Sequence, residues 1–102
     1  MPDTPAPEVH DHPERQEYEV TVDGVHAGLA HYRLVGDGRV FDHTEIDDAF
    51  EGKGIGSVLA RGALDDVIAR DIPFAATCPF ISRFLERHPE YGDAQDRTLL
   101  GG

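Results

Sequence analysis

The segment Gly52-Lys53-Gly54-Ile55-Gly56 combines residue types and spacing that could bind a ligand. Alternate glycines let the backbone turn sharply and let a ligand come close to its amides. A helical pattern that starts near Ile55 would point its first amides and its positive dipole end at the same place. Lys53 adds a positive charge, and the backbone amide of Ser57 extends the run of donors to residues 52–57. The segment is therefore predicted to bind an anion such as a phosphate group.

Two common phosphate-binding motifs do not fit this glycine segment. A P-loop requires a lysine followed by Ser or Thr, whereas Gly54 follows Lys53. A dinucleotide-binding fold places its glycines after the first strand, whereas three strands are expected before this segment. A plain turn at the start of a helix, without a ligand, is the alternative interpretation.

The residues before the glycine segment predict three antiparallel strands. Alternating apolar and polar residues favour strands at 17–22, 25–35 and 39–46. Asp23-Gly24 and Gly36-Asp37-Gly38 separate them as turn signals. Three consecutive strands joined by short turns favour a meander.

The residues after the glycine segment predict helix, strand and helix. Apolar residues recur at helical spacing from Ile55 to about Arg70, and Pro73 ends that pattern. A short apolar strand follows at 74–78, and a shorter helix begins at Pro79. Since a helix joins two strands, we expect a parallel strand pair with a right-handed crossover. The fold class is α+β.

The sequence resembles the GNAT superfamily of N-acetyltransferases. Glu51 to Gly56 looks like the glycine motif with which that superfamily binds the pyrophosphate of acetyl-CoA. Three further segments resemble a short single-domain subgroup: His43-Thr44-Glu45, Thr77-Cys78-Pro79-Phe80 and His88-Pro89-Glu90-Tyr91. The likeness covers roughly residues 17–92. It implies a minimal GNAT-like fold whose sheet is splayed at the cleft for acetyl-CoA or CoA.

The resemblance also implies a set of cofactor-binding residues. They are Gly52, Lys53, Gly54, Ile55, Gly56, Ser57, Phe80, Arg83 and Arg87. Phe80 would line the pantetheine channel or simply pack, and the two arginines would meet the adenosine-end phosphates or act as solvated helix charges. Glu51 stands where the family usually has Gln or Arg. Because a carboxylate repels a diphosphate, we expect Glu51 to point into solvent.

Cys78, His43 and Glu45 are the candidate catalytic residues. Cys78 is expected at the N-cap of the last helix, where a thiolate is stabilised and could carry the acetyl group. The alternatives are a small buried hydrophobe and direct transfer to the amine. His43 and Glu45 alternate on one strand and should share a face, where either could take a proton from the amine. An ordinary structural histidine and a surface carboxylate are the alternatives for this pair.

Many GNAT enzymes carry a tyrosine on the last helix that protonates the departing thiolate. This chain has Phe84 and Leu85 near that position, and neither can donate a proton. Tyr91 lies beyond the proline and is expected to pack. This departure argues against an efficient general acid.

The composition excludes nucleic acid and anionic membranes as partners. Twenty acidic residues oppose nine basic ones, a net charge of -11. Such a field attracts cationic substrates or merely keeps the protein soluble. No signal peptide or bilayer-spanning run is apparent and the single cysteine suits a reducing compartment, so a cytoplasmic location is expected. No metal site is expected.

The predicted organisation is a flexible acidic, proline-rich tail at 1–15, a GNAT-like domain at 16–95 and a flexible C-terminus at 96–102. The predicted function is transfer of acetyl from acetyl-CoA to a primary amine of a small molecule or a protein lysine, directly or through acetyl-Cys78. The alternatives are a non-catalytic acyl-CoA-binding or sensing module and an interaction domain that has lost the cofactor. The oligomeric state is open, with a monomer slightly favoured.

Overall fold

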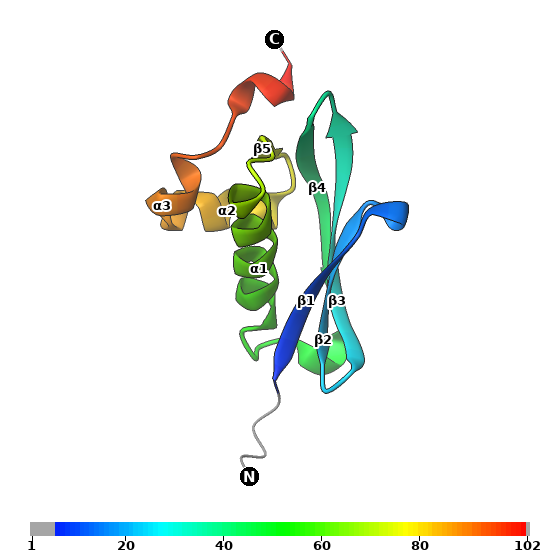
Figure 1. Ribbon diagram of the computed structural model, residues 1–102. Coiled ribbons are helices and arrows are strands. Elements are labelled where there is room, and N and C mark those ends of the chain that lie inside the picture. Colours follow the sequence, from blue (N-terminus) through cyan, green and yellow to red (C-terminus); the bar gives the residue numbers. More distant parts are fainter. Residues whose placement is uncertain (1–5, 102) are drawn as a thin grey trace.

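The structure, a computed structural model, describes residues 6–101, which form one mixed sheet with its α-helices on one side (Figure 1). The sheet has the order β1 (Pro7–His12), β2 (Glu17–Val22), β3 (Val25–Val35), β4 (Gly38–Ile46) and β5 (Phe74–Ala76). The helices are α1 (Ile55–Ala69), α2 (Pro79–Arg87) and α3 (Pro89–Gly92), with short 3-10 helices η1 (Pro13–Arg15), η2 (Asp48–Phe50) and η3 (Arg97–Leu100). Neighbouring strands from β1 to β4 are antiparallel, and β5 is parallel to β4. The predicted α+β fold, meander and parallel pair are confirmed.

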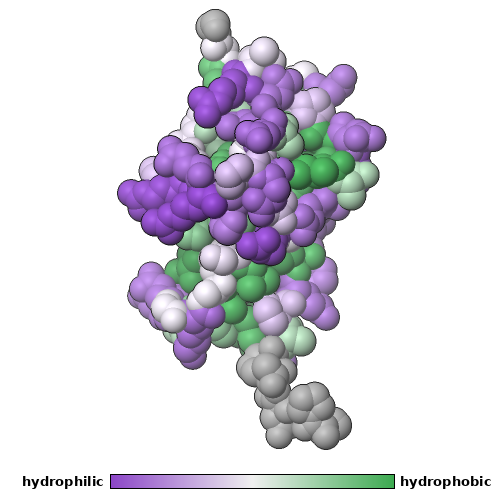
Figure 2. Space-filling view, turned by 90° about the vertical axis from the view of Figure 1, so that its left-hand side faces the viewer, coloured by the Kyte–Doolittle hydropathy of each residue, from purple (hydrophilic) through white to green (hydrophobic). Residues whose placement is uncertain are grey.

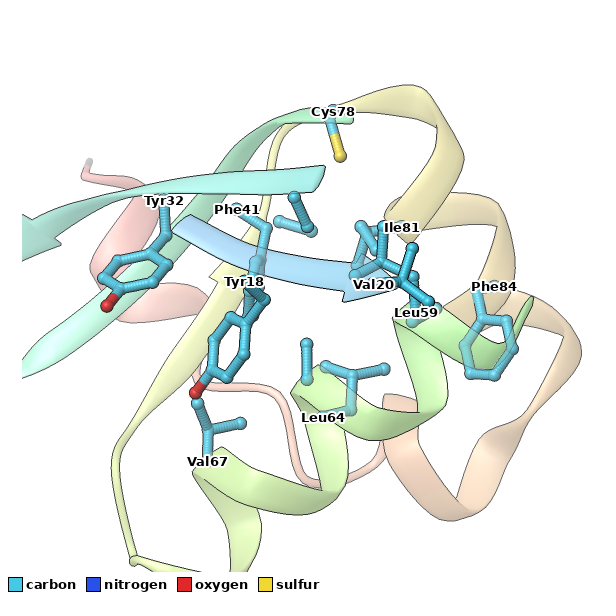
Figure 3. Packing of buried hydrophobic residues seen from close by; sticks show 14 of the residues in the cluster. Tyr18, Val20, Tyr32, Phe41, Leu59, Leu64, Val67, Cys78, Ile81 and Phe84 are labelled. Carbon is cyan, nitrogen blue, oxygen red and sulfur yellow. The ribbon is translucent and has the colours of Figure 1, made fainter. Parts of the chain in front are cut away.

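Helix α1 holds the core against the sheet. Its apolar stripe, which includes Leu59, Leu64 and Val67, is fully buried and joins Tyr18 and Phe41 from the strands (Figure 3). Burying such side chains stabilises the fold by about 1.5–3 kcal/mol each before entropy is counted. Within residues 6–101, no helix is both long and apolar enough to span a bilayer.

The N-terminal segment is a strand and not the flexible tail that its composition suggested. Residues 7–12 pair with β2 along the whole strand, and η1 leads into β2. Val9 packs on Gly62 of α1, where a Cβ would lie only 2.7 Å from Val9 Cγ2. Asp11 accepts hydrogen bonds from Tyr32 and Arg39, so one carboxylate anchors the strand. The prediction is wrong for 7–15, and residues 1–5 lie outside the described range.

The C-terminal segment also departs from the predicted flexible end. Asp96 N donates to Phe74 O at 2.7 Å, and Gln95 Oε1 accepts from Ala76 N at 3.1 Å. Leu99 packs so closely on Gly38 that a Cβ there would meet Leu99 Cδ1 at 2.7 Å. These contacts cover the outer edge of β5, which would otherwise expose unpaired backbone groups. The prediction is therefore wrong for 96–101, and Gly102 lies outside the described residues.

Strands β4 and β5 separate halfway along β4, as the predicted splay requires. Their pairing ends at Phe41 and Ala76. The carbonyl of Phe41 then accepts from both Thr77 N at 2.8 Å and Cys78 N at 3.2 Å, which turns the chain away into α2. Because β4 continues to Ile46, its far half has no ladder partner on the β5 side.

Candidate functional site

A pocket of about 400 Å³ opens beside the unpaired half of β4. It lies between that strand, the glycine segment, the first turn of α1 and the start of α2. Its lining comprises Thr44, Ile46, Phe50, Glu51, Gly52, Gly54, Ile55, Gly56, Ser57 and Phe80. Figure 2 shows the helix-bearing side, where hydrophobic surface gathers in the lower half, at the height of the first turns of α1 in Figure 1.

The amides at the start of α1 are available to a ligand. Gly52 and Gly54 have φ values of +79° and +77°, a left-handed conformation that other residues rarely adopt. Gly54 is the N-cap, and no side chain caps the helix. Among the hydrogen bonds of residues 6–101, none is donated by the amides of residues 52–57. A helix start with open donors and a positive dipole end favours an anion.

A second, smaller hollow of about 130 Å³ continues the pocket along α2. The two share Ser57 and Phe80, and the second adds Arg83, Arg87 and His88. Two exposed arginines one helical turn apart therefore lie at the end of a continuous groove. Among the predicted cofactor-binding residues, only Lys53 does not line either hollow, and its side chain is exposed.

Phe80 lies over the first turn of α1. A Cβ on Gly56 would lie 2.6 Å from Phe80 Cζ, so the ring rests directly on that glycine. Phe80 is 39% exposed and belongs to both hollows. The ring therefore forms a wall of the groove, and the glycine at position 56 makes room for it.

Cys78 is the N-cap of α2, as predicted, but it lies behind the pocket wall. Its side chain is buried, and its sulfur lies 3.3 Å from Thr44 Oγ1. Figure 3 shows the sulfur directed toward the other buried side chains. Thr44 lines the pocket, whereas Cys78 does not. The thiol is thus adjacent to the groove without facing it.

His43 and Glu45 share a face, as predicted, and His43 Nε2 lies 2.6 Å from Glu45 Oε2. Both are exposed, and they alternate with Thr44, which points to the pocket. They consequently lie on the sheet face opposite α1 and opposite Cys78. The three predicted catalytic residues do not form one cluster.

Sequence reasoning missed Thr44, Ile46, Phe50 and His88 as lining residues. Alternation along β4 could have identified Thr44 and Ile46, because they share the face opposite to His43. No local signal marks Phe50, which lies in η2, or His88, the residue after α2.

Comparison with known proteins agrees with this geometry. Residues 17–94 match the model of a family described as GCN5-related N-acetyl-transferase. Protein NATD1 of Bos taurus is 39% identical over 78 residues, which cover 74% of this chain and 68% of that protein. Protein NATD1 of Homo sapiens is 37% identical with the same coverage.

A solved structure shares the fold. The NMR structure of a GCN5-like protein from Staphylococcus aureus superposes with a TM-score of 0.65 at 21% identity, covering 87% of each chain. The family match spans most of the described domain and includes both the glycine segment and the splayed strands. The chain therefore belongs to the GCN5-related N-acetyltransferase family.

Proposed function

We propose that this protein transfers an acetyl group from acetyl-CoA to a primary amine. The observation that carries the proposal is the set of unoccupied amides at 52–57, which open on a pocket beside the gap between β4 and β5. A diphosphate is the anion that such a helix start suits, and a thioester linked to it would reach toward the gap.

The groove matches the parts of a CoA molecule in order. The amides of 52–57 would hold the diphosphate, and Arg83 and Arg87 would meet the phosphate on the ribose. Phe80 and Ile46 offer an apolar wall for the pantetheine chain. Glu51 has an exposed side chain, so its carboxylate can turn away from the diphosphate while the backbone around it still binds.

The acceptor is proposed to approach from the other side of the sheet, where no α-helix lies in Figure 1. This open face consists of the polar residues that alternate with core residues along β1 to β4: Glu8, His10, His12, Glu17, Glu19, His26, His31, Arg33, His43 and Glu45. It holds four glutamates and one arginine, while Arg83 and Arg87 lie on the groove side. A positively charged groove suits the anionic acetyl donor, and a negatively charged open face suits a cationic amine.

Direct transfer fits the thiol's position better than an acetyl-Cys78 intermediate. Cys78 is 4% exposed and is separated from the pocket by Thr44. Bringing amine and thioester together in the gap would lower the barrier by several kcal/mol without any covalent step. The backbone amides of β4 that face the gap could also stabilise the oxyanion.

A second candidate function is acyl-CoA binding without turnover. Tyr91 is 8% exposed, and its hydroxyl donates to Asp65 Oδ1 at 2.7 Å. That hydrogen bond, with burial, raises the pKa of Tyr91. Tyr18 and Tyr32 are buried, and their hydroxyls donate to Asp66 and Asp11. No tyrosine of the described domain is therefore free to protonate the departing thiolate.

Thermal-shift and turnover assays separate these functions. Saturating CoA should raise Tm, since a ligand that binds only the native state stabilises it. The R83A/R87A variant should lose more affinity for CoA than for dephospho-CoA, whereas R33A, an exposed arginine on the open face, should bind both normally. No shift with CoA or acetyl-CoA would refute the cofactor assignment. A clear shift with no product from a panel of amines would favour the binding module.

A further inference from the structure

A histidine and an aspartate meet on the open face at the point where β4 leaves β5. His31 Nδ1 lies 2.8 Å from Asp42 Oδ1. The side chains are 39% and 28% exposed, so the pair is partly sheltered but reachable. Phe41, the neighbour of Asp42, is the last β4 residue paired to β5. The pair therefore stands at the mouth of the gap.

A β-bulge creates this pair. In the β3–β4 ladder His31 pairs with His43 and Tyr32 pairs with Phe41, so Asp42 has no partner of its own. Tyr32 and Phe41 point into the core. The extra residue lets Asp42 bond His31 on the opposite face, as bulges commonly re-aim a side chain beside a functional site.

The hydrogen bond fixes the tautomer of the imidazole. A carboxylate only accepts, so Nδ1 carries the proton that bonds Asp42. The lone pair is then on Nε2, which makes no hydrogen bond within residues 6–101. An imidazole oriented by an acid through one nitrogen, with the other nitrogen free, has the arrangement of a general base.

We propose that His31 is the general base of the acetyl transfer and that Asp42 is its positioning residue; this rests on the function proposed above. His31 Nε2 takes a proton from the ammonium of the acceptor. The neutral amine attacks the thioester carbonyl, a C–N bond forms, and the C–S bond breaks. After attack the nitrogen carries two protons; one passes to the departing CoA thiolate, the other stays on the amide, and His31 returns its proton to water.

The groups around His31 favour this assignment. Glu17 faces it from β2, His43 and Asp42 face it from β4, and Arg33 is the next open-face residue on β3. The carboxylates of Glu17 and Asp42 stabilise a transient imidazolium on His31. Glu17 also accepts a hydrogen bond from Arg15. His43 fits the role less well. It is more exposed, at 59%, and its Nε2 already bonds Glu45, which is itself 64% exposed.

The test compares the pH dependence of kcat/KM in wild type, H31Q, D42N and H26Q. His26 is a matched control, because it lies on the same strand and also bonds a carboxylate, with Nδ1 2.7 Å from Glu19 Oε2. H31Q should lower kcat/KM at neutral pH by about 10²–10⁴-fold, remove the acidic limb of the profile and recover partly with added imidazole. D42N should lose less activity and move the acidic limb to lower pH. CoA affinity should not change in any variant.

Failure of this proposal and failure of the proposed function give different results. If wild type acetylates amines and H31Q keeps the pH profile of H26Q, the base assignment is wrong. If wild type itself binds CoA but acetylates no amine, both ideas are wrong. H31A serves as a second variant, and its Tm shows whether a loss of activity reflects unfolding.

Discussion

Removing the carboxylate of Asp11 should destabilise the whole domain. Asp11 accepts from Tyr32 Oη at 2.7 Å, Arg39 at 2.9 Å and Arg70 at 3.1 Å. Its side chain is 13% exposed and that of Arg39 only 9%. Through this one residue, β1 is bonded to β3, β4 and the end of α1. The substitution D11A leaves the Arg39 charge buried without a carboxylate.

The expected loss follows from what each partner retains. Arg70 is half exposed and still bonds Asp66 at 2.9 Å, so it loses little. Arg39 keeps the Tyr18 hydroxyl at 2.8 Å and the Tyr32 ring 4.4 Å away. Breaking a buried pair costs about 3–5 kcal/mol, and these remaining partners place D11A at the lower end, about 3 kcal/mol. For a domain of this size, that corresponds to a fall in Tm of about 12–24 °C.

Urea unfolding and calorimetry measure this loss. The control is E8A on the same strand, where an exposed glutamate is paired with the exposed His10. Its free energy of unfolding should stay within about 0.5 kcal/mol of wild type. The double variant D11A/R39M should recover part of the loss, because it also removes the unpaired charge. A loss below about 1 kcal/mol in D11A would refute the reasoning, as would a double variant less stable than D11A.

The same carboxylate gives the stability a pH dependence. Burial alone would raise the pKa of Asp11, but hydrogen bonds from Tyr32, Arg39 and Arg70 outweigh burial and hold the pKa below its usual 3.8. A lowered pKa means that the contribution is complete above the unfolded-state pKa of about 4 and is lost as the pH falls below it. D11A should lack this part of the acid transition, whereas E8A should keep it.

Two further outcomes test the groove. G56A places a Cβ 2.6 Å from Phe80 Cζ, and since that exposed ring can move, stability should change by less than about 1 kcal/mol while CoA affinity falls about tenfold. Calorimetric titration measures the affinity, and an equal loss in a Phe80→Ala background would contradict this cause. C78A should keep wild-type turnover, and intact mass after acetyl-CoA exposure should show no adduct on the wild type. Acetylated Cys78 with an inactive C78A would instead establish the covalent route.

Local patterns were enough to predict the central elements. Alternation gave β2, β3 and β4, helical spacing gave α1 from Ile55, and Pro79 marked the start of α2. Each of these signals lies within a single element, because the spacing of its apolar residues reflects the face that the element buries. The glycine segment could be placed for the same reason, because its neighbours in the chain define both the strand before it and the helix after it.

The structure of the two terminal segments could not be predicted in this way, because contacts with residues far away in the sequence hold them in place. Residues 7–12 have few apolar side chains, and they are held by one valine against Gly62 and one aspartate against Arg39. Residues 96–101 are held by one backbone bond from Asp96 to Phe74 of β5 and by the packing of Leu99 on Gly38. Composition records neither kind of contact.

The sequence by itself determined the fold class and the position of the glycine segment between a strand and α1. Only the tertiary structure decided which face of the sheet each candidate side chain lies on and how far apart the candidates are. It set Cys78 behind Thr44, turned His43 and Glu45 to the other face, and, through one extra residue in β4, brought Asp42 to His31. The physical reason is register: a bulge or a splayed pair changes which side of the sheet each residue faces, and register is a property of paired strands, not of either strand alone.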